Sequence, residues 1–99
     1  MKYKIVYLPI AVKDLQEAFD YIFLDKPLAA KVFLNDIDRN VLKLKDFSNI
    51  GIIPKDTYLK YKGYKILIVD NYLIFYLIKK DTIEIQRILH GKRKYQFII

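Results

Sequence analysis

The second half of the chain holds three apolar runs separated by short polar turns. The runs are residues 64–69, 72–78 and 82–90, and the turns are residues 70–71 and 79–81. This spacing predicts three antiparallel strands joined by tight hairpins. The first two runs are too apolar to have a face in water, so we expect both faces of the sheet to be covered.

The first half of the chain changes from strand periodicity to helical periodicity at Pro9. Residues 2–7 largely alternate between polar and apolar side chains, which predicts an edge or flanking strand. From Pro9 to about Leu24, apolar residues recur at steps of three and four, which predicts an amphipathic helix. Its apolar side comprises Val12, Leu15, Ala18, Phe19 and Ile22, and its polar side comprises Lys13, Asp14, Gln16, Glu17 and Asp20.

A second amphipathic helix follows a break at residues 25–27. Pro27 is tolerated only in the first turn of a helix, and Asp25 can cap one. The apolar stripe of this second helix comprises Ala30, Phe33, Leu34, Ile37, Val41 and Leu44. Because the connection is short, we expect the two helices to form an antiparallel hairpin that packs on the sheet. Residues 57–62 are predicted to form a further extended segment.

The order of these elements predicts one α+β domain over residues 1–99: an N-terminal strand, an antiparallel helical hairpin, then a twisted antiparallel sheet of three to four strands. The chain has no cysteine, which excludes a disulfide scaffold and a thiolate site. The N-terminus lacks the pattern of a signal peptide, and no apolar run approaches the ~20 residues that span a bilayer. We therefore expect a cytoplasmic protein without a membrane partner.

The formal charge of +7 is concentrated in the second half of the chain. Residues 1–50 hold eight Lys and Arg against seven Asp and Glu, whereas residues 51–99 hold ten against four. Clustered positive charge attracts polyanions, so nucleic acid, a nucleoprotein or an acidic protein are candidate partners. The alternative is a lysine-rich surface that serves only solubility.

His90, the only histidine of the chain, is a candidate for acid–base chemistry. Histidine is the side chain best suited to accept and donate protons near neutral pH. A lone histidine without cysteines or clustered carboxylates cannot build an ordinary zinc site, so neither a metal nor a cofactor is expected. The alternative is a structural hydrogen bond at the end of a strand.

Arg87 interrupts the apolar face of the last strand. Strict alternation places it on the same face as Ile83 and Ile85. Arg87 then either points into the core and pairs with an acidic residue of the helices, or is swung outward by a β-bulge at residues 86–87. The first arrangement is structural, whereas the second presents the guanidinium to a target.

A basic and aromatic cluster follows Gly91. It comprises Lys92, Arg93, Lys94 and Tyr95. Its cations can neutralise phosphate groups, and its tyrosine can stack on a base. Three further lysines are expected to border the same open surface: Lys60, Lys62 and Lys65.

Three segments of the chain resemble the RelE/ParE superfamily of toxins from type II toxin–antitoxin modules. They are residues 25–34 (DKPLAAKVFL), 69–76 (VDNYLIFY) and 87–95 (RILHGKRKY). The segments are similar to the start of the family's second helix, its central hairpin, and its final strand and tail. The resemblance covers nearly the whole chain and implies the RelE/ParE fold and an acidic antitoxin as partner.

The two branches of the superfamily differ in their targets. RelE-like members cleave mRNA on the ribosome with cations of the central strands and a C-terminal Arg, and Lys65 and Arg93 occupy comparable places here. At two further cationic positions of that branch this chain has Leu67 and Leu73, which cannot stabilise a phosphorane. ParE-like members inhibit DNA gyrase without a hydrolytic site, and the NYLIFY and ILH segments are more similar to theirs.

The sequence therefore favours a ParE-like gyrase inhibitor and leaves two alternatives open. The first is a metal-independent endoribonuclease in which His90 is the acid or base, Arg93 binds the phosphate and Tyr95 positions the substrate. The second is a non-toxic nucleic-acid-binding or adaptor domain on the same fold. In each case Arg87 and the lysines named above are expected to contact the target.

Overall fold

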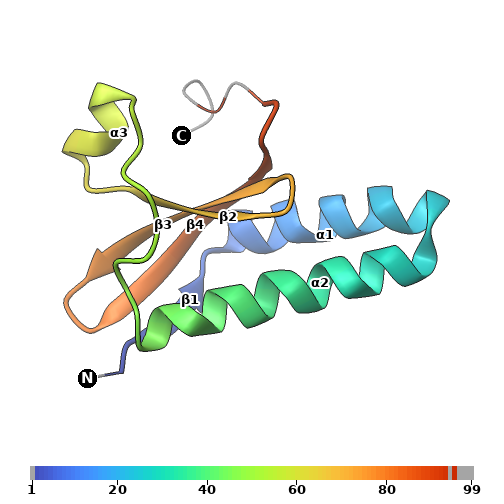
Figure 1. Ribbon diagram of the computed structural model, residues 1–99, viewed down its shortest axis with the longest axis horizontal. Helices are drawn as coiled ribbons and strands as arrows, with labels where there is room; N and C mark the ends of the chain where they lie inside the picture. The colour runs from blue at the N-terminus through green and yellow to red at the C-terminus, as the bar shows by residue number, and fades with distance from the viewer. Residues whose placement is uncertain (1, 94, 96–99) are drawn as a thin grey trace.

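The computed structural model describes residues 2–93 and 95 (Figure 1). Its elements, in chain order, are β1 (Lys4–Tyr7), α1 (Pro9–Asp25), α2 (Pro27–Leu42), a short 3-10 helix (Lys43–Lys45), α3 (Thr57–Tyr61), β2 (Lys65–Val69), β3 (Tyr72–Lys79) and β4 (Thr82–His90). The hairpin of α1 and α2 lies on one side of the sheet, and α3 lies apart from it (Figure 1). No helix in this part of the chain is long and apolar enough to cross a membrane.

Within the described residues, the strands form one four-stranded sheet in the order β1-β4-β3-β2. β2, β3 and β4 pair antiparallel, which confirms the predicted hairpins. β1 is an edge strand, as predicted, but it runs parallel to β4, with Lys4 opposite Thr82 and Tyr7 opposite Ile85. The sheet is therefore mixed. Because β1 is followed by the helical hairpin and not by a tight turn, it is not constrained to run antiparallel to its neighbour β4.

β4 contains a β-bulge at Gln86. Phe75 of β3 lies opposite Arg87, whereas the next residue, Tyr76, lies opposite Ile85, so Gln86 has no partner on β3. The extra residue reverses the alternation that follows it. Ile85 and Ile88 consequently both belong to the core beneath the helices. The bulge that we considered as one of two alternatives for residues 86–87 is therefore present.

The helical hairpin packs on the sheet through α1 and α2. In α2, the predicted stripe is largely confirmed, since Ala30, Phe33, Ile37 and Val41 are buried, although Leu34 is exposed. In α1, the prediction is confirmed in part, since Ala18 is buried and Leu15 and Ile22 pack against the core. The buried residues are Ala11, Asp14 and Ala18, whereas Val12 is exposed. The two small alanines let α1 approach the sheet closely, and Asp14 lies between them.

A smaller core covers the other face of the sheet, as the apolar runs required. It comprises Leu59, Ile66, Phe75 and Leu89. Leu59 belongs to α3, in a region for which we predicted extended structure, and that prediction was wrong. Asp56 caps the helix, because its Oδ1 accepts a hydrogen bond of 3.0 Å from the Leu59 N–H.

The loop between the 3-10 helix and α3 is fastened to the sheet by Tyr76. The Tyr76 hydroxyl donates to the carbonyl of Ser48 (2.7 Å) and accepts from the Gly51 N–H (3.0 Å). A Cβ at position 51 would lie 2.6 Å from that hydroxyl oxygen, so the contact requires glycine. Burial raises the pKa of Tyr76, which keeps the phenol protonated.

Candidate functional site

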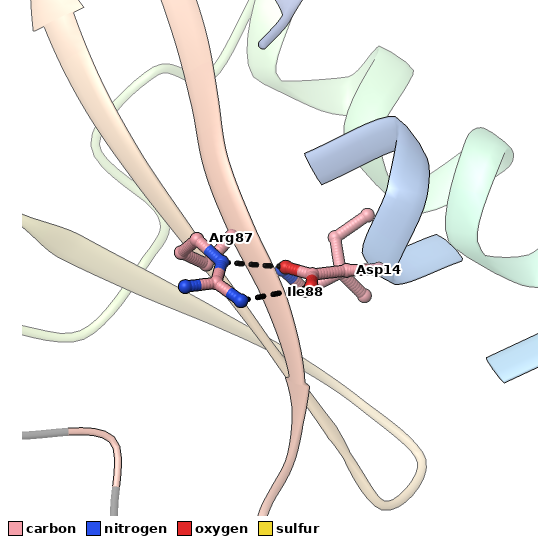
Figure 2. A network of polar contacts seen from close by, with 3 residues as sticks. All are labelled: Asp14, Arg87 and Ile88. Atoms are coloured by element: carbon pink, nitrogen blue, oxygen red, sulfur yellow. Dashed lines mark hydrogen bonds and ion pairs between the residues drawn. The ribbon is translucent and has the colours of Figure 1, made fainter. Parts of the chain in front are cut away.

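Asp14 and Arg87 form an ion pair between α1 and β4 (Figure 2). Arg87 Nε lies 2.7 Å from Asp14 Oδ2, and Arg87 Nη2 lies 2.9 Å from Asp14 Oδ1. The Arg87 side chain is 13% exposed, and the Asp14 side chain is 5% exposed. These hydrogen bonds raise the pKa of Arg87, although burial opposes the shift. A bidentate, partly buried pair of this kind holds both side chains in one geometry.

The position of Asp14 follows from the end of β1. Among the described residues, the Leu8 N–H makes the last backbone hydrogen bond on this edge of β4, to the Ile85 carbonyl, and no strand pairs with the edge beyond it. Asp14 Oδ2 accepts a 3.0 Å hydrogen bond from the Ile88 N–H on that edge. The carboxylate thus continues the pairing where the strand stops. Arg87 pairs with an acidic residue of the helices, as the first of our two alternatives predicted. The bulge of the second alternative is also present, and it places Arg87 opposite Phe75, on the face of the smaller core and not on that of Ile83 and Ile85.

A cavity of about 160 Å³ lies beside this pair, between α1 and the end of β4. Asp14 and Glu17 of α1 contribute to one wall, and His90 and Arg93 contribute to another. Tyr72 of β3 also lines the cavity. The structure therefore brings His90 and Arg93 together, as the sequence analysis expected. It adds Asp14, Glu17 and Tyr72, which the sequence analysis did not select.

His90 is held at the root of the C-terminal tail. Its ring meets the ring of Tyr72 edge to face, with centroids 5.3 Å apart, and Tyr72 in turn packs on Phe33 at 4.8 Å. His90 Nδ1 accepts a 3.2 Å hydrogen bond from the Lys92 N–H. In this arrangement Nδ1 is unprotonated, so a proton of neutral His90 is on Nε2. That tautomer leaves one ring nitrogen to donate or to exchange a proton.

The tail crosses toward the other face of the sheet after His90. The Gly91 N–H donates to the Asn71 carbonyl (2.8 Å), and the Arg93 N–H donates to the His90 carbonyl (3.0 Å). The ring of Tyr95 packs edge to face on Phe75, with centroids 4.9 Å apart, in the smaller core beneath α3. Tyr95 therefore does not line the cavity that His90 and Arg93 share.

The predicted lysines do not gather around that cavity. Lys65 lies opposite Tyr76, whereas His90 lies opposite Tyr72, so the two are four residues apart along β3 and on different neighbouring strands. Lys60 is in α3 and Lys62 follows it, in the layer over the smaller core. Lys92 is exposed beside His90, and Lys94 lies outside the described residues. The expected single cationic surface with Lys65, His90 and Arg93 is thus not formed.

The fold defined by these elements is shared with a solved structure. A solved structure titled "Chromosomal ParDE TA system from P. aeruginosa" superposes with a TM-score of 0.77 and 19% sequence identity, covering 92% of this chain and 98% of that one. No curated protein sequence matches the chain. The structural likeness by itself concerns the fold.

The family is established by sequence. The model of the family described as "ParE toxin of type II toxin-antitoxin system, parDE" matches residues 5–95. The chain belongs to this ParE toxin family, which confirms the resemblance to the RelE/ParE superfamily and the preference for its ParE branch.

Proposed function

We propose that the chain arrests growth by inhibiting DNA gyrase in the cytoplasm and that a cognate acidic antitoxin restrains it. The observation that carries this proposal is the match to the ParE toxin family over residues 5–95. The resemblance to ParE-like toxins implies gyrase as the target and no hydrolytic site.

The packing of the central strands supports this choice over the nucleolytic branch. Leu67 is buried in the core beneath the helices, and Leu73 packs against the smaller core on the other face. Both positions serve packing and carry no charge. Of the two cations shared with that branch, Lys65 lies opposite Tyr76 of β3, whereas Arg93 lines the cavity beside Tyr72, four residues away along β3. A developing phosphorane needs cations that converge on it.

The surface of the helical hairpin supports an antitoxin partner. Tyr21, Leu24 and Leu28 are 78%, 87% and 76% exposed near the connection between α1 and α2. Exposed apolar groups of this size mark surfaces that a partner covers. The net positive charge of the chain favours an acidic one. Co-expression of a small acidic protein from the same operon is expected to restore growth, and an operon without such a protein contradicts this part of the proposal.

Controlled expression in a bacterial host tests the target. Plasmid DNA from arrested cells is expected to lose negative supercoils, while ribosome-bound mRNA remains intact. Intact supercoiling with cleaved mRNA contradicts gyrase as the target. Normal growth on full expression of the folded chain favours the adaptor alternative.

An endoribonuclease is the second candidate, because His90 and Arg93 line the same cavity. In this reading His90 exchanges a proton through Nε2, and Arg93 contacts the phosphate. The paired substitutions His90→Ala and Arg93→Ala are expected to abolish mRNA cleavage if this activity exists. Lys26→Ala, an exposed cation at the far end of the helical hairpin, is the control that retains it.

A further inference from the structure

The outer surface of α3 presents two exposed tyrosines. Tyr58 and Tyr61 are 59% and 85% exposed, whereas Leu59 between them is buried and fastens α3 to the sheet. Residues three apart on a helix are neighbours on its surface. The two rings therefore lie beside each other and face away from the protein. α3 itself lies apart from the helical hairpin (Figure 1).

Lysines are concentrated in the segment that carries these two rings. Residues 55–65 contain four lysines and a single acidic residue, Asp56. The Asp56 carboxylate is occupied as the cap of α3. Lys62 Nζ lies 6.0 Å from the centroid of the Tyr58 ring. Within the described residues, Lys60 and Lys62 make no ion pair, so their charges face solvent.

Tyr64 and Lys79 extend the same surface. Burial raises the pKa of Tyr64, Tyr58 raises it further, and the ammonium group of Lys79 partly opposes both effects. The Tyr64 N–H donates to the Leu59 carbonyl of α3 (3.1 Å), and the Tyr64 ring packs against the smaller core beside it. Gly63, at a φ of +87°, makes the turn that joins α3 to β2. The turn thus keeps Tyr64 beside the exposed tyrosines and lysines of the α3 segment.

We propose that this surface, formed by Tyr58, Tyr61, Tyr64, Lys60 and Lys62, binds single-stranded nucleic acid. The exposed rings stack on unpaired bases, and the lysines contact the phosphates between them. In a duplex the faces of the bases are covered by their neighbours, so the rings have nothing to stack on. An acidic peptide would satisfy the lysines but would leave the rings without a partner. The inference does not depend on gyrase being the target.

Fluorescence anisotropy of a labelled oligothymidylate, titrated with the full chain, tests the proposal. The paired substitutions Tyr58→Ala and Tyr61→Ala are expected to weaken binding on the order of 100-fold, because each stacked base is worth about 1–3 kcal/mol. The matching pair of phenylalanine substitutions keeps the rings and is expected to retain most of the affinity. Lys60→Gln with Lys62→Gln is expected to lower the slope of log affinity against log salt by about 0.7 per lysine.

Controls use the same residue types on the helical hairpin. Tyr21→Ala, at a 78% exposed position of α1, and Lys31→Gln, at an exposed position of α2, are expected to bind like the unaltered chain. Circular dichroism establishes that each variant is folded. The proposal is overturned if the folded chain does not bind the oligothymidylate, if duplex DNA binds as tightly, or if the alanine pair binds as well as the unaltered chain.

Discussion

Asp14→Ala removes the carboxylate that joins α1 to the open edge of β4. That carboxylate accepts hydrogen bonds from Arg87 Nε, Arg87 Nη2 and the Ile88 N–H at 2.7, 2.9 and 3.0 Å. The variant leaves the buried Ile88 N–H without this acceptor and the guanidinium without this counter-charge. Loss of one partner from a buried pair costs about 3–5 kcal/mol. Because the Arg87 side chain is 13% exposed, we expect the lower end, about 3 kcal/mol.

Urea unfolding followed by far-UV circular dichroism measures this change in the free energy of unfolding. Asp14→Asn keeps an oxygen for the Ile88 N–H but loses the charge, so its cost is expected to fall between those of alanine and the unaltered chain. Asp20→Ala, an exposed acid on the same helix, is the control and is expected to stay within about 0.5 kcal/mol. A cost for Asp14→Ala below about 1 kcal/mol, or equal to that of the control, refutes the reasoning.

Three further predictions concern stability, each measured by unfolding. Gly51→Ala is expected to lower the free energy of unfolding by about 1–3 kcal/mol, since its Cβ would meet the Tyr76 hydroxyl oxygen at 2.6 Å. An unchanged free energy of unfolding contradicts this contact. Gly63→Ala is expected to lower the free energy of unfolding by about 1 kcal/mol through backbone strain alone, because φ is +87° and no atom lies within 4 Å of the new Cβ. Thermal unfolding measures this loss, and an unchanged stability argues against the left-handed turn at Gly63. The free energy of unfolding is expected to fall as the pH rises above about 10, because unfolded tyrosines ionise there while burial raises the pKa of Tyr72 and Tyr76 in the fold. Stability that stays constant between about pH 9 and 11 contradicts the burial of these phenols.

The long periodic elements of the fold could be predicted from the sequence. The helices and the three C-terminal strands carry apolar repeats over many residues, and short polar turns mark their ends. α3 could not be recognised in this way, because it is a single turn that depends on the Asp56 cap and on Leu59. The parallel pairing of β1 depends on contacts far apart in sequence, which local patterns do not encode.

The candidate site was predicted only in part, for reasons of geometry. Arg87 stood out because a charge interrupted an apolar face, and that anomaly correctly indicated a partner on the helices. Asp14 appeared to belong to the polar side of α1. Its burial could not be foreseen from the helical pattern, because it is caused by a strand more than seventy residues away. Lys65 was expected to border the same open surface as His90, but the strand register places Lys65 opposite Tyr76 and His90 opposite Tyr72, four residues apart along β3.

The most direct test of gyrase inhibition is the supercoiling of relaxed plasmid by purified gyrase as the folded chain is added. Supercoiling is expected to fall with increasing amounts of the chain and to return when the cognate antitoxin is supplied. Supercoiling that proceeds undiminished at concentrations that arrest growth would contradict gyrase as the target.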